Sequence, residues 1–175
     1  MTLEGKKVAF LVAEGVEDLE YYAVAMRLQE EGMVVLTAAM DLKSVKGKNG
    51  LEINPDTKIE DLVANDLFGL VLPGGWAPDK VRRYKVATDL VAKVNEQGKI
   101  IGIICHGGLL AISAKIVAGK KTVGSLGIKD DLLNAGATWV DESAFRDGNQ
   151  VWGRVVADIP AFNRELVAAF QQAAA

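Results

Sequence analysis

Short apolar runs alternate with helical patterns along most of the chain. Four runs lack the polar alternation of a half-exposed strand and predict buried strands at residues 7–13, 34–39, 69–72 and 100–104. Helical periodicity follows at residues 17–31, 87–97, 109–117, 128–134 and 161–170. Strands that alternate with helices form βαβ units, so the pattern predicts a mostly parallel sheet with helices on both faces.

Two helices have apolar residues at a spacing that predicts their buried faces. In the first helix these are Leu19, Tyr22, Ala23 and Met26, before a C-terminal Gly32. In the next they are Ala87, Leu90, Val91 and Val94, before Gly98. We expect both stripes to pack on the sheet.

Two segments depart from the alternation of strands and helices. Residues 44–53, around Gly47–Gly50, and residues 144–152, around Asp147–Asn149, have the turn residues of hairpins. We expect both hairpins at the periphery of the sheet. A short strand is expected at 122–125. No linker or repeat divides the sequence, so residues 1–175 are interpreted as one domain.

Composition narrows the range of partners and cofactors. The 175 residues include 20 Lys plus Arg and 23 Asp plus Glu, and the net charge of -3 gives no reason to expect nucleic acid or an anionic membrane as partner. The longest apolar stretch, 100–114, falls short of the roughly 20 residues of a membrane span, and no signal peptide is recognised. We expect a soluble, cytoplasmic protein. One Cys and one His exclude an internal disulfide and are too few for a structural zinc site, so no metal is expected.

Candidate chemistry gathers where predicted strands end and helices begin, the usual ligand edge of a parallel sheet. Cys105 and His106 follow the strand at 100–104 and precede two glycines, as in a sharp turn that exposes a nucleophile. A helix N-terminus and an adjacent imidazole would both favour the thiolate. The alternative is a small buried cysteine beside a polar helix start.

Three further residues at this edge have a structural and a functional interpretation. Gly75 either belongs to an ordinary turn or supplies, with the N–H of His106, an oxyanion hole. Glu17 either caps a helix or serves the site, provided that the first and fourth strands are neighbours. Asp79 is a helix-start residue or a site residue, and Trp76 is a pocket wall. No G-x-G-x-x-G dinucleotide motif is present.

Several segments together are similar to one known family. They are residues 8–12 with 15–20, 72–75 with 77–82, 104–107, 128–132 with 134–137, and 157–162. In this order they resemble the PfpI intracellular protease-like branch of the ThiJ/PfpI superfamily, which is related in fold to class I glutamine amidotransferases. An amidotransferase itself is disfavoured, because its catalytic His comes from a later segment and the single His here is His106.

The resemblance implies a flavodoxin-like three-layer α/β/α sandwich and oligomers built from dimers. By position, Cys105 matches the nucleophile and His106 its partner. Glu17 matches the carboxylate that contacts the sulfur, and Gly75 the oxyanion-hole glycine. Asp79 matches an acidic residue that in some members reaches the His of a neighbouring subunit.

The sequence departs from the family pattern around the expected pocket. Gly108 stands where Pro is frequent, Gly124 and Ser125 replace a Ser and an aromatic residue, and Trp152 and Gly153 replace small hydroxyl residues. We therefore expect Trp76, Ser125 and Trp152 to shape the pocket.

The resemblance favours a cofactor-free, cysteine-dependent enzyme that acts on a small reactive carbonyl or acyl substrate. Members act as glyoxalase III-type enzymes, deglycases or intracellular cysteine peptidases. The partners expected are a small carbonyl compound or a peptide, and further copies of the chain, with the site near their interface. The alternative is a redox-sensing or holdase stress-response protein, in which oxidation of Cys105 replaces turnover.

Overall fold

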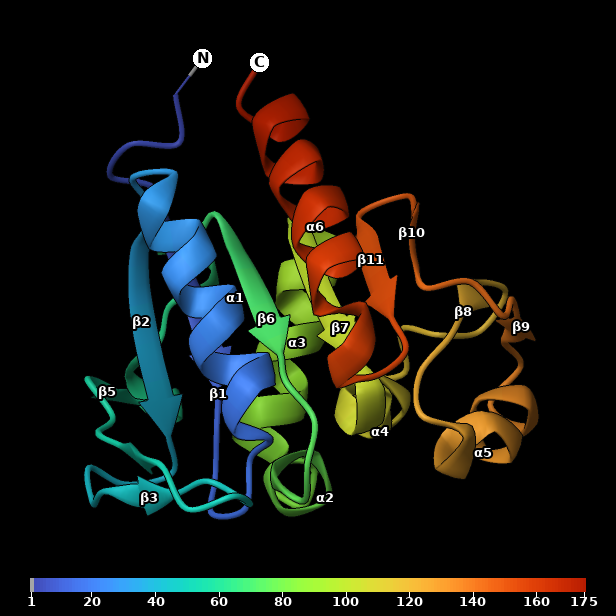
Figure 1. Ribbon diagram of the computed structural model, residues 1–175, viewed down its shortest axis with the longest axis horizontal. Helices are drawn as coiled ribbons and strands as arrows, with labels where there is room; N and C mark the ends of the chain where they lie inside the picture. Colours follow the sequence, from blue (N-terminus) through green and yellow to red (C-terminus); the bar gives the residue numbers. More distant parts are fainter. Residues whose placement is uncertain (1) are drawn as a thin grey trace.

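A mostly parallel sheet of seven strands forms the middle layer of the computed structural model, which describes residues 2–175 (Figure 1). The strand order is β10-β11-β7-β6-β1-β2-β5, and only β10 is antiparallel to its neighbour. The strands are β1 (Lys7–Leu11), β2 (Val34–Ala39), β5 (Thr57–Lys58), β6 (Gly69–Leu72), β7 (Ile100–Ile104), β10 (Ala144–Asp147) and β11 (Gln150–Gly153).

Helices cover both faces of the sheet. The first face carries α1 (Asp18–Glu30) and α6 (Ile159–Ala173), which lie side by side in Figure 1. The second face carries α3 (Lys85–Glu96), α4 (Gly108–Ser113) and α5 (Lys129–Asn134), while α2 (Ala77–Val81) lies beyond the end of β6. The expected flavodoxin-like three-layer sandwich is confirmed.

The central strand β7 explains why the apolar runs do not alternate. Ile101 and Ile103 point into the core beneath α3 and α4, whereas Ile100 and Ile104 point into the core beneath α1 and α6. All four side chains are buried. A strand covered on both faces needs apolar residues on both faces.

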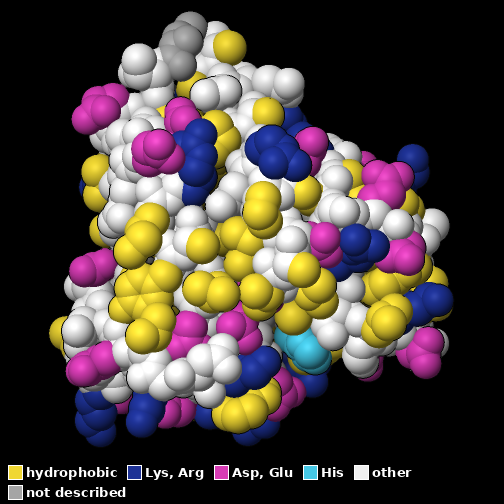
Figure 2. Space-filling view, in the orientation of Figure 1, with side chains coloured by type: hydrophobic (Ala, Val, Ile, Leu, Met, Phe, Trp, Pro, Cys, Tyr) yellow, Lys and Arg dark blue, Asp and Glu magenta, His cyan; other side chains and the backbone are white. Residues whose placement is uncertain are grey.

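Helix α1 packs with a different face from the one expected. Leu19 and Met26 are 49% and 60% exposed, and apolar side chains lie over α1 at the surface in Figure 2. The buried face carries Val24, Ala25 and Leu28 together with acidic residues of the first turn. The expectation was wrong because it followed only apolar residues, and this helix buries carboxylates near the site.

Two other expectations need correction. The first and fourth predicted strands are not neighbours, because β6 lies between β1 and β7. Helix α4 ends at Ser113 rather than at residue 117, because Lys115 adopts a left-handed conformation with φ of 60°.

Both expected hairpins form. The strands β3 (Val45–Lys46) and β4 (Glu52–Ile53) pair in a small separate sheet, whereas the strand β11 of the second hairpin joins β7 and extends the main sheet. The strand expected at 122–125 is β8 (Lys121–Thr122), which pairs with β9 (Thr138–Trp139). Within residues 2–175 no helix combines the length and the apolar character needed to cross a membrane.

Candidate functional site

A pocket of about 370 Å³ opens at the carboxyl edge of the sheet, beyond β1, β6 and β7. Its lining comes from five loops and the start of α1: Glu17, Glu20, Lys48, Gly75, Trp76, Cys105, His106, Ser125, Val155, Val156 and Ala157. The single histidine is visible at the surface near acidic and basic side chains (Figure 2). The topology therefore brings together the loops that the sequence singled out.

Cys105 occupies a sharp turn between β7 and α4. Its φ of 57° is left-handed, which is uncommon for a residue other than glycine and is concentrated at functional sites. Gly107 permits this turn, since a Cβ there would lie 2.1 Å from the carbonyl oxygen of Leu72. The backbone thus holds the sulfur in the pocket.

Two backbone N–H groups, of His106 and Gly75, interact with the sulfur of Cys105 and favour its thiolate. Gly75 has a φ of 71°, and a Cβ there would lie 2.4 Å from the backbone of Glu17. Glycine is therefore required for its N–H to face the pocket. Both donors therefore face the sulfur, and two such N–H groups can stabilise a negative charge there.

Glu20 is the carboxylate that adjoins the sulfur. A Cβ added to Gly74 would lie 2.8 Å from Cys105 Cβ and 2.6 Å from Glu20 Oε2, so these two side chains lie close together. The N–H of Gly74 donates to that oxygen at 2.7 Å, and Oε1 is buried with no hydrogen-bond partner within residues 2–175. Burial raises the pKa of Glu20 from 4.5 to about 7.

Glu17 lines the same pocket but does not take the position that the sequence analysis gave it. Its Oε2 lies 3.1 Å from the Lys48 ammonium, and its Oε1 accepts a hydrogen bond of 2.9 Å from Asn49. The carboxylate at the sulfur is Glu20, one helical turn later. This correction follows from helix geometry, because Glu20 lies four residues before the buried Val24.

The thiol of Cys105 is less acidic than expected. Burial, the largest influence, and the charge of Glu20 raise its pKa from 9.0 to about 12. The expectation of a lowered pKa was wrong, because the helical turn at Cys105 has only three residues and the adjacent imidazole carries no charge to offset burial. With these pKa values the two neighbouring groups together hold one proton just above neutral pH, and it resides mainly on the sulfur. We call them the Cys105–Glu20 pair.

His106 is available as a neutral base. Its Nδ1 lies 3.4 Å from Cys105 Sγ. Burial, followed by the charge of Lys48, lowers the pKa of the imidazole below 6.5. At neutral pH the ring can therefore take up a proton from a nearby carbon, sulfur or oxygen.

Asp79 lies at the start of α2, outside the pocket lining. Its carboxylate pairs with Arg82 at 2.9 Å and with Arg83 at 2.6 Å. These guanidinium groups hold the pKa of Asp79 below its ordinary value. Within one chain, the structure does not bring Asp79 to the pocket.

The three residues expected to shape the pocket divide into two groups. Trp76 and Ser125 line it, and Trp76 is 62% exposed. Trp152 is fully buried in the core and lies outside the lining, because its position in β11 points it beneath α4.

The packing around Gly108 leaves no room for a side chain. A Cβ on Gly108 would lie 2.8 Å from Ile128 and 3.4 Å from Trp152. These bulky neighbours explain the glycine at 108.

Two charged residues of the site were missed in the sequence. Glu20 could have been found from Val24 and Leu28, which lie four and eight residues later on the same helical face. Lys48 comes from the tip of the β3–β4 hairpin, and no local pattern connects that turn with Cys105.

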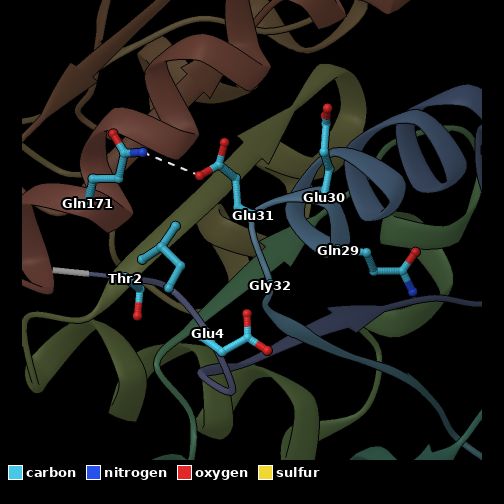
Figure 3. A pocket seen from close by; sticks show the side chains of 8 residues that line it. Thr2, Glu4, Gln29, Glu30, Glu31, Gly32 and Gln171 are labelled. Carbon is cyan, nitrogen blue, oxygen red and sulfur yellow. Dashed lines mark hydrogen bonds between the residues drawn. The ribbon is translucent and has the colours of Figure 1, made fainter.

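A larger hollow, of about 790 Å³, lies at the opposite end of α1 (Figure 3). Its lining includes Glu4, Glu30, Glu31 and Gln171, with no cysteine or histidine among the described lining residues. Size alone therefore does not identify the site. Within residues 2–175 no three His, Cys, Asp or Glu residues are grouped as metal ligands would be.

Known proteins are similar to this chain in sequence and in architecture. The model of the DJ-1/PfpI family matches residues 6–169. A deglycase of Pyrococcus horikoshii is 40% identical over 161 residues, 92% of this chain and 97% of the relative. A Bacillus subtilis protein, whose name marks it as a candidate cysteine protease, is 35% identical over 161 residues, 91% of this chain and 95% of the relative.

One solved structure extends the comparison. A two-domain protein of Anabaena variabilis, with DJ-1/ThiJ/PfpI-like and ferritin-like domains, matches with a TM-score of 0.91 and 33% identity. The match covers 93% of this chain and 47% of that chain, so this chain spans about half the length of that protein. Since the family match, the sequence relatives and this fold all cover nearly the whole chain, the chain belongs to the DJ-1/PfpI family.

Proposed function

We propose that the protein is a cysteine-dependent enzyme that acts on a small reactive carbonyl or acyl substrate, with Cys105 as nucleophile. The observation that carries this proposal is the placement of the Cys105 sulfur between two backbone N–H donors, in a pocket that also holds Glu20 and His106. A buried structural cysteine needs none of these groups. The deglycase and protease names of the relatives support the same class of chemistry.

The first step is addition of Cys105 Sγ to the substrate carbonyl carbon. A carbon–sulfur bond forms, and the π electrons of the carbonyl move to its oxygen. The N–H groups of Gly75 and His106 hold this oxygen. The thiol proton passes to Glu20, whose pKa of about 7 suits a proton acceptor at neutral pH, and then to the oxygen.

Two outcomes follow for two substrate classes. In a 2-oxoaldehyde, neutral His106 removes the proton from the carbon bonded to sulfur and returns it to the adjacent carbon. The hydroxyl proton of the adduct passes to the neighbouring carbonyl oxygen, so the adduct becomes the thioester of a 2-hydroxy acid. Water then releases a 2-hydroxy acid and the thiol, so no external oxidant is consumed. In an acyl substrate, the oxyanion re-forms the carbonyl and expels the amine, which takes from Glu20 the proton that the thiol gave up. Water then hydrolyses the resulting thioester, which releases the acid and restores the thiol.

We propose further that the enzyme works as a homodimer or higher oligomer in which Asp79 of one subunit orients His106 of another. His106 forms an imidazolium when it takes a proton, and a carboxylate is the usual group that orients and stabilises it. Glu17 is engaged with Lys48, and Glu20 is committed to the sulfur. Asp79 is 43% exposed, so it is accessible to a second copy.

A substrate panel tests the proposed activity. Methylglyoxal, its hemithioacetal with a small thiol and a fluorogenic peptide are compared with wild type, Cys105→Ala and the remote control Ser113→Ala. We expect turnover of at least one substrate, a loss of about 10³-fold or more in Cys105→Ala and no change in the control. Turnover that survives in Cys105→Ala would contradict the mechanism. No turnover on any substrate, with stoichiometric oxidation of Cys105 by peroxide, would support a redox sensor instead.

A further inference from the structure

The tip of the β3–β4 hairpin reaches the pocket from a distant part of the sequence. The pocket lining includes Lys48, and its ammonium nitrogen lies 3.1 Å from Glu17 Oε2. The backbone holds the tip in place, because Lys48 N–H donates to the carbonyl oxygen of Val16 at 2.8 Å and Gly15 N–H donates to that of Lys46 at 2.8 Å. These backbone hydrogen bonds therefore place Lys48 at the pocket.

Asp18 fastens this tip to helix α1. It is 2% exposed, and its two carboxylate oxygens accept hydrogen bonds from the N–H groups of Asn49, at 2.7 Å, and Leu51, at 2.8 Å. These bonds keep the pKa of Asp18 below its ordinary value in spite of burial. Gly47 allows the close approach, since a Cβ there would lie 2.3 Å from Asp18 Oδ1.

Most of the ionisable groups around the sulfur are acidic, and Lys48 is positively charged. Glu17, Glu20 and Cys105 are acidic groups, His106 is neutral at pH 7, and Lys48 is the one Lys or Arg among the described residues of the lining. The ammonium interacts with the charges of Glu17, Cys105 and Glu20. Without it, the negative charge that forms on the sulfur or on a substrate oxygen would face only like charges.

We propose that Lys48 supplies the positive charge that stabilises the anionic form of the Cys105–Glu20 pair, and that Asp18 is the positioning residue that holds Lys48 at the pocket. This inference deepens the proposed function and rests on Cys105 as the nucleophile. Alkylation of the sulfur can be measured whether or not the protein turns over a substrate. Failure of the charge role and failure of the enzymatic role are therefore distinguishable.

Lys48→Met is compared with Lys48→Arg and with Lys46→Met, which removes the same charge two residues away on the exposed side of the hairpin. The pH dependence of iodoacetamide alkylation is measured for each. We expect the inflection in Lys48→Met to move upward by about one pH unit, so that alkylation at pH 7 slows up to about tenfold. Lys48→Arg and Lys46→Met should stay within about twofold of wild type.

A second reagent tests whether the charge acts at the sulfur itself. Iodoacetate has nearly the same shape as iodoacetamide but is anionic, so the rate ratio of the two reports the local potential. Lys48→Met should lower the iodoacetate-to-iodoacetamide ratio about threefold or more, and Lys46→Met should leave it unchanged. An unchanged ratio and an unchanged inflection in Lys48→Met would overturn the charge role.

Asp18→Asn tests the positioning role. It should shift the alkylation profile in the same direction as Lys48→Met, and adding it to Lys48→Met should cause no further shift. If Asp18→Asn does not fold, Gly47→Ala displaces the same tip by crowding Asp18. Two outcomes would show that Asp18 does not act through Lys48. One is additive shifts in the double variant, and the other is a wild-type alkylation profile in folded Asp18→Asn or Gly47→Ala.

Discussion

The two ends of helix α1 carry the same kind of side chain in opposite surroundings. At the N-terminal end, Glu20 is fully buried beside a thiol, and its pKa rises to about 7. At the C-terminal end, Glu30 and Glu31 line the acidic hollow of Figure 3 and pair with Arg27 at 3.2 and 2.6 Å. Glu30 and Glu31 thus each pair with a cation, while Glu20 has a buried oxygen without a hydrogen-bond partner within residues 2–175.

The difference shows which feature marks a reactive site. A partly exposed carboxylate that pairs with a cation has its charge balanced by that partner and by water. A carboxylate that is buried with an oxygen lacking a hydrogen-bond partner is costly, so its persistence points to a task. Glu20 and Glu31 are therefore matched residues for testing this distinction.

The largest expected difference between the two ends is in turnover. Glu20→Gln removes the proton acceptor of Cys105 and should lower kcat on the best substrate of the panel by about a hundredfold or more. Glu31→Gln should remain within about twofold of wild type. Steady-state kinetics on both variants measures this, and equal losses would remove the contrast between the two ends.

A second difference concerns stability against pH. Because the folded-state pKa of Glu20 lies above the unfolded value, its contribution to stability is fully present below about pH 4.5 and is lost as the pH rises through about 7. Each pKa unit is worth about 1.4 kcal/mol, so the loss is on the order of 3 kcal/mol.

Urea unfolding of wild type and Glu20→Gln between pH 4 and 8 measures this loss. We expect the stability of the variant relative to wild type to increase with pH across this window. Glu31→Gln should run parallel to wild type. A constant difference between Glu20→Gln and wild type would mean that Glu20 ionises normally in the folded protein.

A smaller effect is expected for Asp79, the exposed carboxylate proposed to act across an interface. Asp79→Ala should lower activity about tenfold or more, through loss of His106 orientation. Mixing Cys105→Ala with Asp79→Ala subunits should restore part of the rate, because one mixed site has both groups. No recovery in verified mixed oligomers, or full activity of Asp79→Ala, would remove Asp79 from the site.

The smallest effect belongs to the exposed end of α1. Glu31→Gln breaks the partly exposed ion pair with Arg27, and pairs near the surface are worth about 0.2–1 kcal/mol. We expect the free energy of unfolding to fall by less than about 1 kcal/mol, and by less still in 0.5 M salt. A loss of several kcal/mol in the free energy of unfolding would contradict the expected difference between Glu31 and the buried Glu20.

Much of the fold could be predicted because local patterns control it. The apolar run of β7 follows from burial on both faces, and the hairpins follow from their turn residues. The site could be predicted only where sequence order places residues at one edge, as for Cys105 and Gly75. Lys48 and the buried position of Trp152 depend on packing between distant segments, which no local pattern contains.

Cys105 and Glu20 are proposed to act as a pair that shares one proton. The direct test is the pH dependence of iodoacetamide alkylation in wild type, Glu20→Gln and Glu17→Gln. In wild type the rate should rise through about pH 7, where the pair loses its first proton and a thiolate can form by transfer to Glu20. In Glu20→Gln only a buried thiol remains, so the inflection should move above its ordinary pKa of 9.0. Glu17→Gln should move the inflection in the opposite direction, because the charge of Glu17 raises the pKa of Glu20. Coincident profiles for wild type and Glu20→Gln would contradict the account.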